Sequence, residues 1–455
     1  MALLSWTVLG VAVLSSAPAL ADSEIDALRE QLEALTAVVE QQAEELRQLK
    51  QQQAKQDPAA AGADGVQNAE PSSLMGSAAP RQPLGRFPDD AIVTAGTFGG
   101  SLQIPGDDAS IRLGGFVRLE GSYDFDNMGI QDVTSVRTIP LDGTAKDDTS
   151  QARFHIRNSR LNVDYRKTTA LGPLRTFFEV DIFGGGGEFI NNYELRVRHL
   201  AAQIGNVYVG QWWSYFDDVQ SIPETSDFGG PLGAPILRNP GIRWAADVAS
   251  GWRLGVGVEN PAGDIEDPDD LFASDEMPDI TGFAQVTRSW GRLRVAGVVR
   301  RLSSTQDDVT VGGINLSGRL SLPFGGGKDN IVFQAQLGEG FTHYYSTFAG
   351  QGLAGFIDAD GRIEATGITS GYIAYQRWWS EQWRSTVYAS VLDLDNPESA
   401  PGSTFSHGEY YAANLFWTPF RGATFGMELV HAAREIESGL EGDGTRFQIS
   451  ARVDF

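Results

Sequence analysis

Arginine side chains recur on one face of several alternating segments of this sequence, and they are its clearest candidates for chemistry. In the segment 111–125, Arg112 and Arg118 stand opposite Leu113. A planar guanidinium can bind a carboxylate at two points, and a group of arginines attracts anions. The pattern therefore offers electrostatic recognition of anions. The arginines that follow it are Arg112, Arg118, Arg160, Arg175, Arg196, Arg198, Arg253, Arg292, Arg294, Arg300, Arg319, Arg384, Arg446 and Arg452.

Carboxylates share this face, notably Glu120, Glu179, Asp181 and Glu194. Each of them can neutralise a neighbouring arginine. For any single arginine, a structural ion pair is thus at least as well supported by the sequence as a role in ligand binding.

Residues for catalysis or for a metal centre occur without the spacing that either requires. The five histidines are scattered, and no H-E-x-x-H or G-x-S-x-G motif is present. The glycine runs 184–187 and 325–327 lack a following Lys-Ser/Thr, so they indicate turns. The acidic stretch 264–279 fits no defined calcium loop and favours a solvated loop. Cysteine is absent, which excludes disulfides and thiolate sites. We predict no enzymatic activity, no cofactor and no catalytic or structural metal.

The segments that carry the arginines alternate with the period of two that is typical of β-strands. From Phe447 to Phe455 the apolar residues occupy one face, while Arg446, Gln448 and Arg452 occupy the other. About ten residues in a tilted strand cross a bilayer, and a lipid-facing arginine at its centre would cost about 2–4 kcal/mol. The arginine faces should therefore line an interior. The pattern predicts an all-β fold, a transmembrane antiparallel up-and-down β-barrel.

Sixteen candidate strands follow Ile111, and an even number places both ends of the barrel on the periplasmic side. Short connections such as 289–290 alternate with long ones such as 216–238, as periplasmic turns alternate with external loops. Aromatic residues at strand ends, including Trp212 and Trp290, suit interfacial girdles. We expect a protein of the Gram-negative outer membrane. The candidate strands are 111–125, 153–166, 174–183, 193–197, 207–214, 239–246, 252–259, 280–287, 291–300, 314–322, 330–338, 371–379, 383–391, 411–417, 425–429 and 445–455.

The composition agrees with an outer-membrane barrel and argues against other classes of protein. The net charge of −24 argues against a nucleic-acid partner, because phosphate contacts need a cationic surface. No apolar run of 18 or more residues follows residue 21, which argues against a mature transmembrane helix. Low hydropathy is compatible with a barrel, since half of each strand faces water.

Residues 1–21 have the features of a secretory signal peptide. An apolar stretch covers 3–14, and Ala19-Leu20-Ala21 fits a small-x-small cleavage site. The positive charge usual near the start of a signal is missing, which leaves the position of the true start open.

Two segments separate this signal from the barrel, which we place at residues 99–455. Residues 22–56 carry apolar residues at heptad positions, a pattern typical of a coiled coil and hence of an oligomer. The heptads alone do not determine the number of chains. Residues 57–98 are rich in Ala, Gly and Pro without periodicity, which indicates a flexible linker.

Three segments carry a resemblance to a known family: 99–106 with GGSLQIPG, 209–216 with VGQWWSYF, and 227–244 with DFGGP and LRNPGIRW. They resemble the DcaP-like family of Gram-negative outer-membrane porins, over nearly the whole mature chain. The resemblance implies homotrimers with a periplasmic coiled-coil extension. It also implies passive uptake of small anionic solutes, dicarboxylates in particular, through a basic constriction.

The same resemblance implies that loop 216–238, which follows the fifth strand, folds inward and narrows the channel. Arg157, Arg160, Arg238 and Arg243 would then be anion contacts. The candidates for the substrate path and its constriction are Arg118, Arg157, Arg160, Arg196, Arg198, Arg238, Arg243, Asp217 and Asp227, with Asp218 and Glu224 also on the loop.

Other functions remain open at this point. A sugar porin would need a continuous run of aromatic residues, but the inward Phe116, Phe177, Tyr372, Tyr388 and Tyr410 are scattered. A phosphate porin would need a denser set of Lys and Arg. A barrel that merely anchors a coiled-coil tether between outer membrane and cell wall is a structural alternative. The expected partners are two further copies of the chain, outer-membrane lipid, lipopolysaccharide and small anions.

Overall fold

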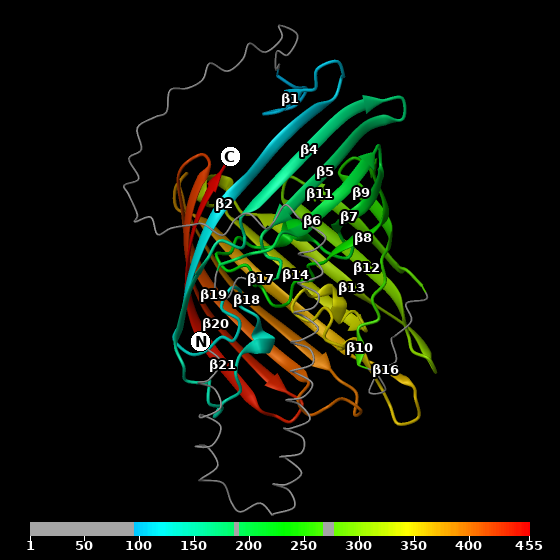
Figure 1. Ribbon diagram of the computed structural model, residues 1–455, viewed down its shortest axis with the longest axis vertical. Helices are drawn as coiled ribbons and strands as arrows, with labels where there is room; N and C mark the ends of the chain where they lie inside the picture. Colours follow the sequence, from blue (N-terminus) through cyan, green and yellow to red (C-terminus); the bar gives the residue numbers. More distant parts are fainter. Residues whose placement is uncertain (1–94, 186–190, 267–276) are drawn as a thin grey trace, which may run out of the picture. The chain divides into compact units, whose positions relative to one another are not determined.

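The described part of the chain forms a sheet that closes on itself. The computed structural model describes residues 95–185, 191–266 and 277–455, and Figure 1 shows their strands wrapped into a barrel. Every pairing within this sheet is antiparallel. No helix among the described residues has the length and apolarity needed to cross a bilayer.

Eighteen labelled strands make up this sheet. The two-residue β1 (Leu102–Gln103) only borders β2 (Ser110–Asp124). The strands β3 (Gln151–His155) and β4 (Arg160–Thr169) pair with successive parts of β2 and form one interrupted strand. The barrel wall in the described residues therefore has sixteen strands, which confirms the predicted fold.

The other strands of the wall follow in chain order. They are β5 (Gly172–Asp181), β6 (Arg196–Ile204), β7 (Val207–Trp213), β8 (Arg238–Ala249), β9 (Trp252–Glu259), β11 (Asp279–Arg288), β12 (Gly291–Ser303), β13 (Asp308–Ser321), β14 (Asn330–Glu339), β17 (Gly367–Trp378), β18 (Trp383–Asp395), β19 (Phe405–Phe420), β20 (Ala423–Ile436) and β21 (Glu441–Asp454). A small second sheet contains β10 (Ile265–Glu266), β15 (Gly355–Ile357) and β16 (Ile363–Ala365).

Short and long connections lie at opposite ends of the barrel. The chain turns tightly at 170–171, 205–206 and 250–251, and the last two turns contain Gly205 and Gly251 at positive φ, which glycine adopts without strain. The other end carries the longer loops after β2, β7, β9 and β14. This is the asymmetry that the sequence predicted.

The seam between the first and last strands closes the barrel. β21 pairs with β2 from Phe116 opposite Asp454 to Asp124 opposite Arg446, and Figure 1 shows these strands side by side. Arg446 and Asp124 form a two-point ion pair at this seam, with exposed fractions of 0% and 1%. Arg446 also donates to the carbonyl of Ile130 over 2.9 Å. The seam thus contains a fully enclosed charge pair with further hydrogen bonds.

Apolar side chains cover the outside of the wall. Exposed residues such as Leu113, Leu161, Ile314 and Leu337 alternate with polar residues that point inward. Exposed tryptophans lie on β8, β9, β18 and β19 and in the turns after β11 and β17, as an interfacial girdle requires. These are Trp244, Trp252, Trp290, Trp379, Trp383 and Trp417.

Three details of the sequence prediction change. Trp212, predicted for the girdle, instead packs against Phe177 and His199 inside the barrel, with ring centroids 5.6 and 4.3 Å away. β6 begins at Arg196, so Tyr193 precedes the strand. The lumen also holds a loop and a cluster of buried rings, which alternation does not reveal. The predicted signal peptide and coiled coil, and nearly all of the predicted linker, lie outside the described residues.

Removing one partner of the seam pair should destabilise the barrel. Asp124→Asn removes the ion-pair partner of the buried Arg446, and such a loss costs about 3–5 kcal/mol. We expect the free energy of unfolding to fall by about that amount, measured by urea unfolding in lipid vesicles with tryptophan fluorescence. Asp308→Asn is the matched control, because its pair with Arg301 is about one-third exposed and such pairs contribute little. Equal effects of both substitutions would contradict the prediction.

Candidate functional site

Residues 214–237, which we call the inner loop, connect β7 to β8 and fold into the barrel. Side chains of the wall hold the beginning of this loop. Arg294 Nη2 donates to the carbonyl of Tyr215 over 2.6 Å, and Asn315 Nδ2 donates to that of Phe216 over 2.9 Å. The loop therefore starts along the wall formed by β12 and β13.

Carboxylates fix the middle of the inner loop. Asp218 accepts hydrogen bonds from Arg292 Nη2 over 2.7 and 2.8 Å and from Ser317 Oγ over 2.6 Å. Further along, Glu224 forms a two-point ion pair with Arg384 on β18. These loop acids neutralise arginines of the wall behind them, and so those arginines contribute structure and little free positive charge.

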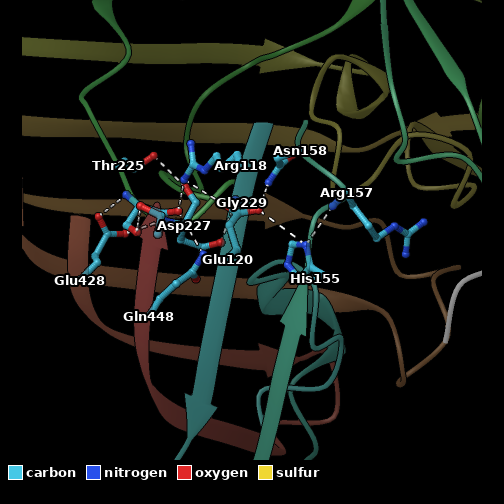
Figure 2. Close-up of polar contacts among 12 residues, drawn as sticks. Arg118, Glu120, His155, Arg157, Asn158, Thr225, Asp227, Gly229, Glu428 and Gln448 are labelled. Carbon is cyan, nitrogen blue, oxygen red and sulfur yellow. Dashed lines mark hydrogen bonds and ion pairs between the residues drawn. The ribbon is translucent and has the colours of Figure 1, made fainter. Parts of the chain in front are cut away.

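Hydrogen bonds hold the tip of the inner loop against the strands near the seam. Glu428 on β20 accepts hydrogen bonds from the backbone N–H of Ser226 over 2.8 Å and from that of Asp227 over 3.2 Å. Tyr410 donates to Asp227 Oδ2 over 2.8 Å, and Gln448 donates to the Ser226 carbonyl over 3.0 Å. Figure 2 shows Glu428 and Gln448 gathered around Asp227. The loop thus runs across the interior from β7 to β21.

Arg118 on β2 belongs to the same anchoring group. Its Nη2 donates to the Ser226 carbonyl and lies 2.8 Å from Glu120 Oε1. Glu120 also accepts a hydrogen bond from Asn158 Nδ2, and Figure 2 shows these side chains close together, with His155 beside them. Arg118, predicted for the substrate path, therefore helps to hold the loop tip.

Four other arginines gather on β4, β6 and at the start of β8, and we call Arg160, Arg196, Arg198 and Arg238 the cationic wall. They are close enough to repel one another electrostatically. Asp181 accepts hydrogen bonds from Arg196 over 3.0 and 2.7 Å and from Arg198 over 2.8 Å. Glu179 accepts one from Arg198 over 3.0 Å and lies 3.7 Å from Arg160. Among the described residues, two carboxylates thus face these four guanidiniums, an excess of two positive charges.

An irregularity in β6 turns the adjacent side chains of Arg198 and His199 towards this cluster. The pairing of β5 with β6 shifts after Glu179, which pairs with His199, so that Val180 pairs with Val197 and Arg198 has no direct partner. A bulge of this kind redirects the side chain of the extra residue. Arg198 and His199 are consequently both buried, although simple alternation would send one of them to the outside.

Arg238 differs from its neighbours because no carboxylate among the described residues is within ion-pairing distance of it. Its guanidinium carbon lies 5.2 Å from the ring centre of Trp213, and the same ring is 5.9 Å from Arg198. A cation over an aromatic face is held in place without losing its charge. Arg238 is therefore a positioned guanidinium that can accept an anion.

The tip of the inner loop approaches the cationic wall through an aromatic contact. Phe228 lies 5.4 Å from Phe183, which follows β5, and 5.8 Å from the guanidinium of Arg198. Phe183 in turn lies 4.9 Å from that of Arg196. The candidate constriction is therefore bounded by the cationic wall and by Phe228 of the loop.

Arg157, also predicted for the path, stands beside this region but is paired. It donates to Asp132 over 2.7 Å, and Arg153 donates to the same carboxylate over 2.8 Å. Burial alone would raise the pKa of Asp132, but these hydrogen bonds outweigh it and the pKa lies below the usual value. Asp132 is in the loop after β2, so this pairing ties that loop to the site.

Three predicted path residues are enclosed and have supporting roles instead. Arg243 is 1% exposed and pairs with Glu259 at 3.0 Å. Asp227 is fully buried at the loop tip. Asp217 accepts the backbone N–H of Leu237 over 2.6 Å and so joins the two ends of the inner loop. Burial raises the pKa of Asp217 well above its usual range, which disfavours its charged form.

Sequence reasoning missed Asp132, Trp213 and Phe228 as parts of the site. The last two belong to the segments QWWS and DFGG that carried the family resemblance, and this was the available signal. In the part of the chain that the structure describes, no group of three or more His, Asp or Glu side chains is arranged to hold a metal ion.

The comparison with protein families agrees with this geometry. The family described as DcaP outer membrane protein matches residues 95–455. The chain belongs to the DcaP outer membrane protein family. It is therefore placed among outer-membrane channels, and its resemblance to this family is confirmed.

Solved structures show where the fold recurs. The outer membrane channel DcaP of Acinetobacter baumannii has a TM-score of 0.69 and 20% identity, covering 80% of this chain and 100% of its own. The anion-selective porin from Comamonas acidovorans has a TM-score of 0.52 and 12% identity, covering 76% of this chain and 100% of its own. Outer-membrane-expressed OmpT of Vibrio cholerae has a TM-score of 0.50 and 12% identity, covering 78% of this chain and 100% of its own. At these identities the likeness concerns the fold. No curated protein sequence matches the chain.

Loosening the tip of the inner loop should change the channel. Glu428→Ala removes the acceptor of two backbone N–H groups of the loop. We expect a noisier current and a larger size limit for permeating solutes, measured on single channels in planar bilayers. Glu409→Ala on β19 is the control, since Glu409 lies on the outer face. Unchanged noise and size limit in Glu428→Ala would show that the loop does not depend on this anchor.

Proposed function

We propose that this DcaP family member is a porin for the passive diffusion of small anionic solutes through a constriction at the cationic wall. The observation that carries the proposal is the excess of two guanidinium charges there, with Arg238 free of any carboxylate among the described residues. Groups of arginine in a narrow pore attract anions and repel cations. The remaining lumen arginines are largely neutralised by the acids of the inner loop and the neighbouring strands.

Dicarboxylates are the anions that this arrangement suits best. Each carboxylate can be bound at two points by a guanidinium, and a dianion matches the two excess charges of the cationic wall. The family resemblance supports the same class of solute. The Comamonas acidovorans porin, which shares the fold, is named for its anion selectivity.

We further propose that the protein is a homotrimer whose contacts involve β4 to β7. Among the described residues, every exposed tryptophan lies from β8 onward. A lipid-facing arc carries an interfacial aromatic girdle, whereas an arc covered by another protomer does not need one. The outer face of β4 to β7 instead presents aliphatic residues such as Leu161, Leu200 and Val209. This asymmetry supports a protein contact on that arc.

The segments before the barrel complete the proposal. Residues 22–56 would form a coiled coil in the periplasm that supports the trimer, with residues 57–98 as the linker. Lipid and lipopolysaccharide would contact the arc from β8 to β20. A tether to the cell wall is the alternative role for the coiled coil. Deletion of residues 22–92 that weakens the envelope but leaves conductance unchanged would favour the tether.

Removing the unpaired arginine should reduce anion preference. Two unit charges 4 Å apart interact by about 1 kcal/mol in water, and a fixed positive charge repels a cation as much as it attracts an anion. Arg238→Gln should therefore lower the anion-to-cation permeability ratio by the equivalent of about 2 kcal/mol, roughly thirtyfold. Reversal potentials under a KCl gradient measure this ratio. Arg362→Gln is the control, because Arg362 is 73% exposed on an external loop. A wild-type channel that prefers cations would refute the proposal.

The dicarboxylate preference has its own measurement. Liposomes containing the channel should swell faster in succinate than in a neutral sugar of similar size, and Arg238→Gln should reduce the difference. Equal rates in the wild type would leave a general pore and remove the dicarboxylate preference.

A bulky residue on the proposed contact arc should disrupt the trimer. Leu161→Trp is compatible with lipid but not with a packed protein interface, because overpacking costs about 1–3 kcal/mol. We expect a monomer band on semi-native gels and by light scattering. Ile373→Trp is the control, since Ile373 is 58% exposed on β17, outside the proposed arc. Dissociation by the control, and not by Leu161→Trp, would move the interface elsewhere.

A further inference from the structure

A cleft beside the inner loop is not needed for the anion constriction. It has a volume of about 220 Å³ and lies between β7, the beginning of the inner loop, and the strands β8, β9, β11 and β12. Its residues Tyr208 and Arg253 are each the second residue of a strand that follows a tight turn. The cleft is thus on the turn side of the inner loop, which is the periplasmic side of the barrel.

Aromatic rings form much of the lining of this cleft. Tyr208, Trp212, Tyr215 and Phe283 all contribute to it. Tyr215 packs edge-on against Phe283 with centroids 5.0 Å apart, and Arg294 lies 3.8 Å from the Phe283 ring centre. These contacts hold the rings in fixed positions. Pre-positioned aromatic faces are what a site needs in order to pack against a ligand ring.

Polar groups without protein partners point to a ligand with hydrogen-bonding groups. Among the described residues, none forms a hydrogen bond with the hydroxyls of Tyr208 and Tyr215 or with the indole N–H of Trp212. Arg294 Nε and Asp217 Oδ1 are buried and also without a partner. The buried Arg294 Nε and Asp217 Oδ1 favour a ligand that can satisfy them, because an unmet buried polar group costs about 1–3 kcal/mol. The tyrosine hydroxyls and the indole N–H belong to half-buried residues and can bond the same ligand.

The charges of the cleft favour an anion. Arg253 and Arg294 line it, and the ion-pair partner of Arg253 among the described residues is Asp247, which is 76% exposed. The acids at the rim contribute little opposing charge: Asp218 is neutralised by Arg292, and burial raises the pKa of Asp217. Trp213 lines the cleft as well and packs against Arg238. The cleft therefore adjoins the cationic wall.

We propose that this cleft is a binding subsite for a monocyclic sugar acid, a hydroxylated six-membered ring that carries one carboxylate. The ring would pack against Trp212 and Tyr208, its hydroxyls would bond the tyrosine hydroxyls and Gln285, and its carboxylate would bind Arg253 and Arg294. A cleft of this size is below the roughly 300–1,000 Å³ of sites for drug-sized ligands, which suits one ring. This inference rests on the proposed anion channel and extends its solutes beyond dicarboxylates.

Blockade of single channels formed by the full chain tests the proposal. The probes are glucuronate, glucose, benzoate and glutarate, added from the periplasmic side of a planar bilayer. Glucuronate should interrupt the current for longer than the other three, because glucose lacks the carboxylate, benzoate lacks the hydroxyls and glutarate lacks the ring. Glucose or benzoate binding as tightly as glucuronate would overturn the proposal.

Two substitutions separate the contributions of the cleft. Tyr208→Phe removes one hydroxyl and should weaken glucuronate binding about three- to tenfold, as expected for one hydrogen bond, with glutarate unaffected. Arg253→Gln should weaken glucuronate more than glucose. Tyr411→Phe is the matched control, since Tyr411 lies on the outer face of β19 and bonds Glu409. Unchanged glucuronate binding in both cleft variants would refute the subsite.

The outcome is distinguishable from that of the proposed function. A channel that is anion-selective by its reversal potential but shows no longer blockade by glucuronate would refute the subsite and leave the anion porin standing. A cation-selective reversal potential would refute the anion porin itself.

Discussion

The exclusion of water from the bilayer core is the constraint on which this structure depends. Every backbone polar group that meets lipid must be satisfied within the protein, and only a closed sheet does this with strands. The seam of β2 with β21 completes that closure. The same constraint keeps charged side chains off the outer face and sends them to the interior. A barrel of this kind therefore concentrates its charges in the lumen. The pairing of these charges determines which solutes the channel attracts or repels.

Most of those charges cancel, and the inner loop decides which do not. Its acids Asp218 and Glu224 neutralise Arg292 and Arg384 on the strands that the loop follows. The strands β4 and β6 and the start of β8 receive no acid from the loop. Among the described residues, the arginines of the cationic wall have Glu179 and Asp181 as their ion-pair partners. The positive excess is thus a consequence of the path that the loop takes as much as of the number of arginines.

Local sequence patterns were enough to predict the strands of the barrel wall. The positions of the site residues depend on contacts between residues far apart in the chain. The alternation in β21 or β13 is a property of neighbouring residues, so each strand could be found from the sequence. Family resemblance singled out Arg160 and Arg238, which lie together in the cationic wall. Alternation could not show that Asp217 and Arg243 are enclosed, because the burial of both depends on loop and strand packing far along the chain. It also misplaced Trp212, since a tryptophan at a strand end suits an interfacial girdle and a lumen equally. The bulge that turns Arg198 inward has no signal in a single sequence.

The anchoring of the inner loop also bears on how the molecule is made. The N–H of Leu232 bonds Ser390 across 158 positions, that of Ser226 bonds Glu428 across 202, and the Ser226 hydroxyl bonds Ser450 across 224. None of these partners is in place until the last four strands have joined the sheet. Contacts so distant along the chain are expected to form late in folding. The inner loop therefore narrows the channel only at the end of assembly. A barrel that is not yet closed has no fixed constriction.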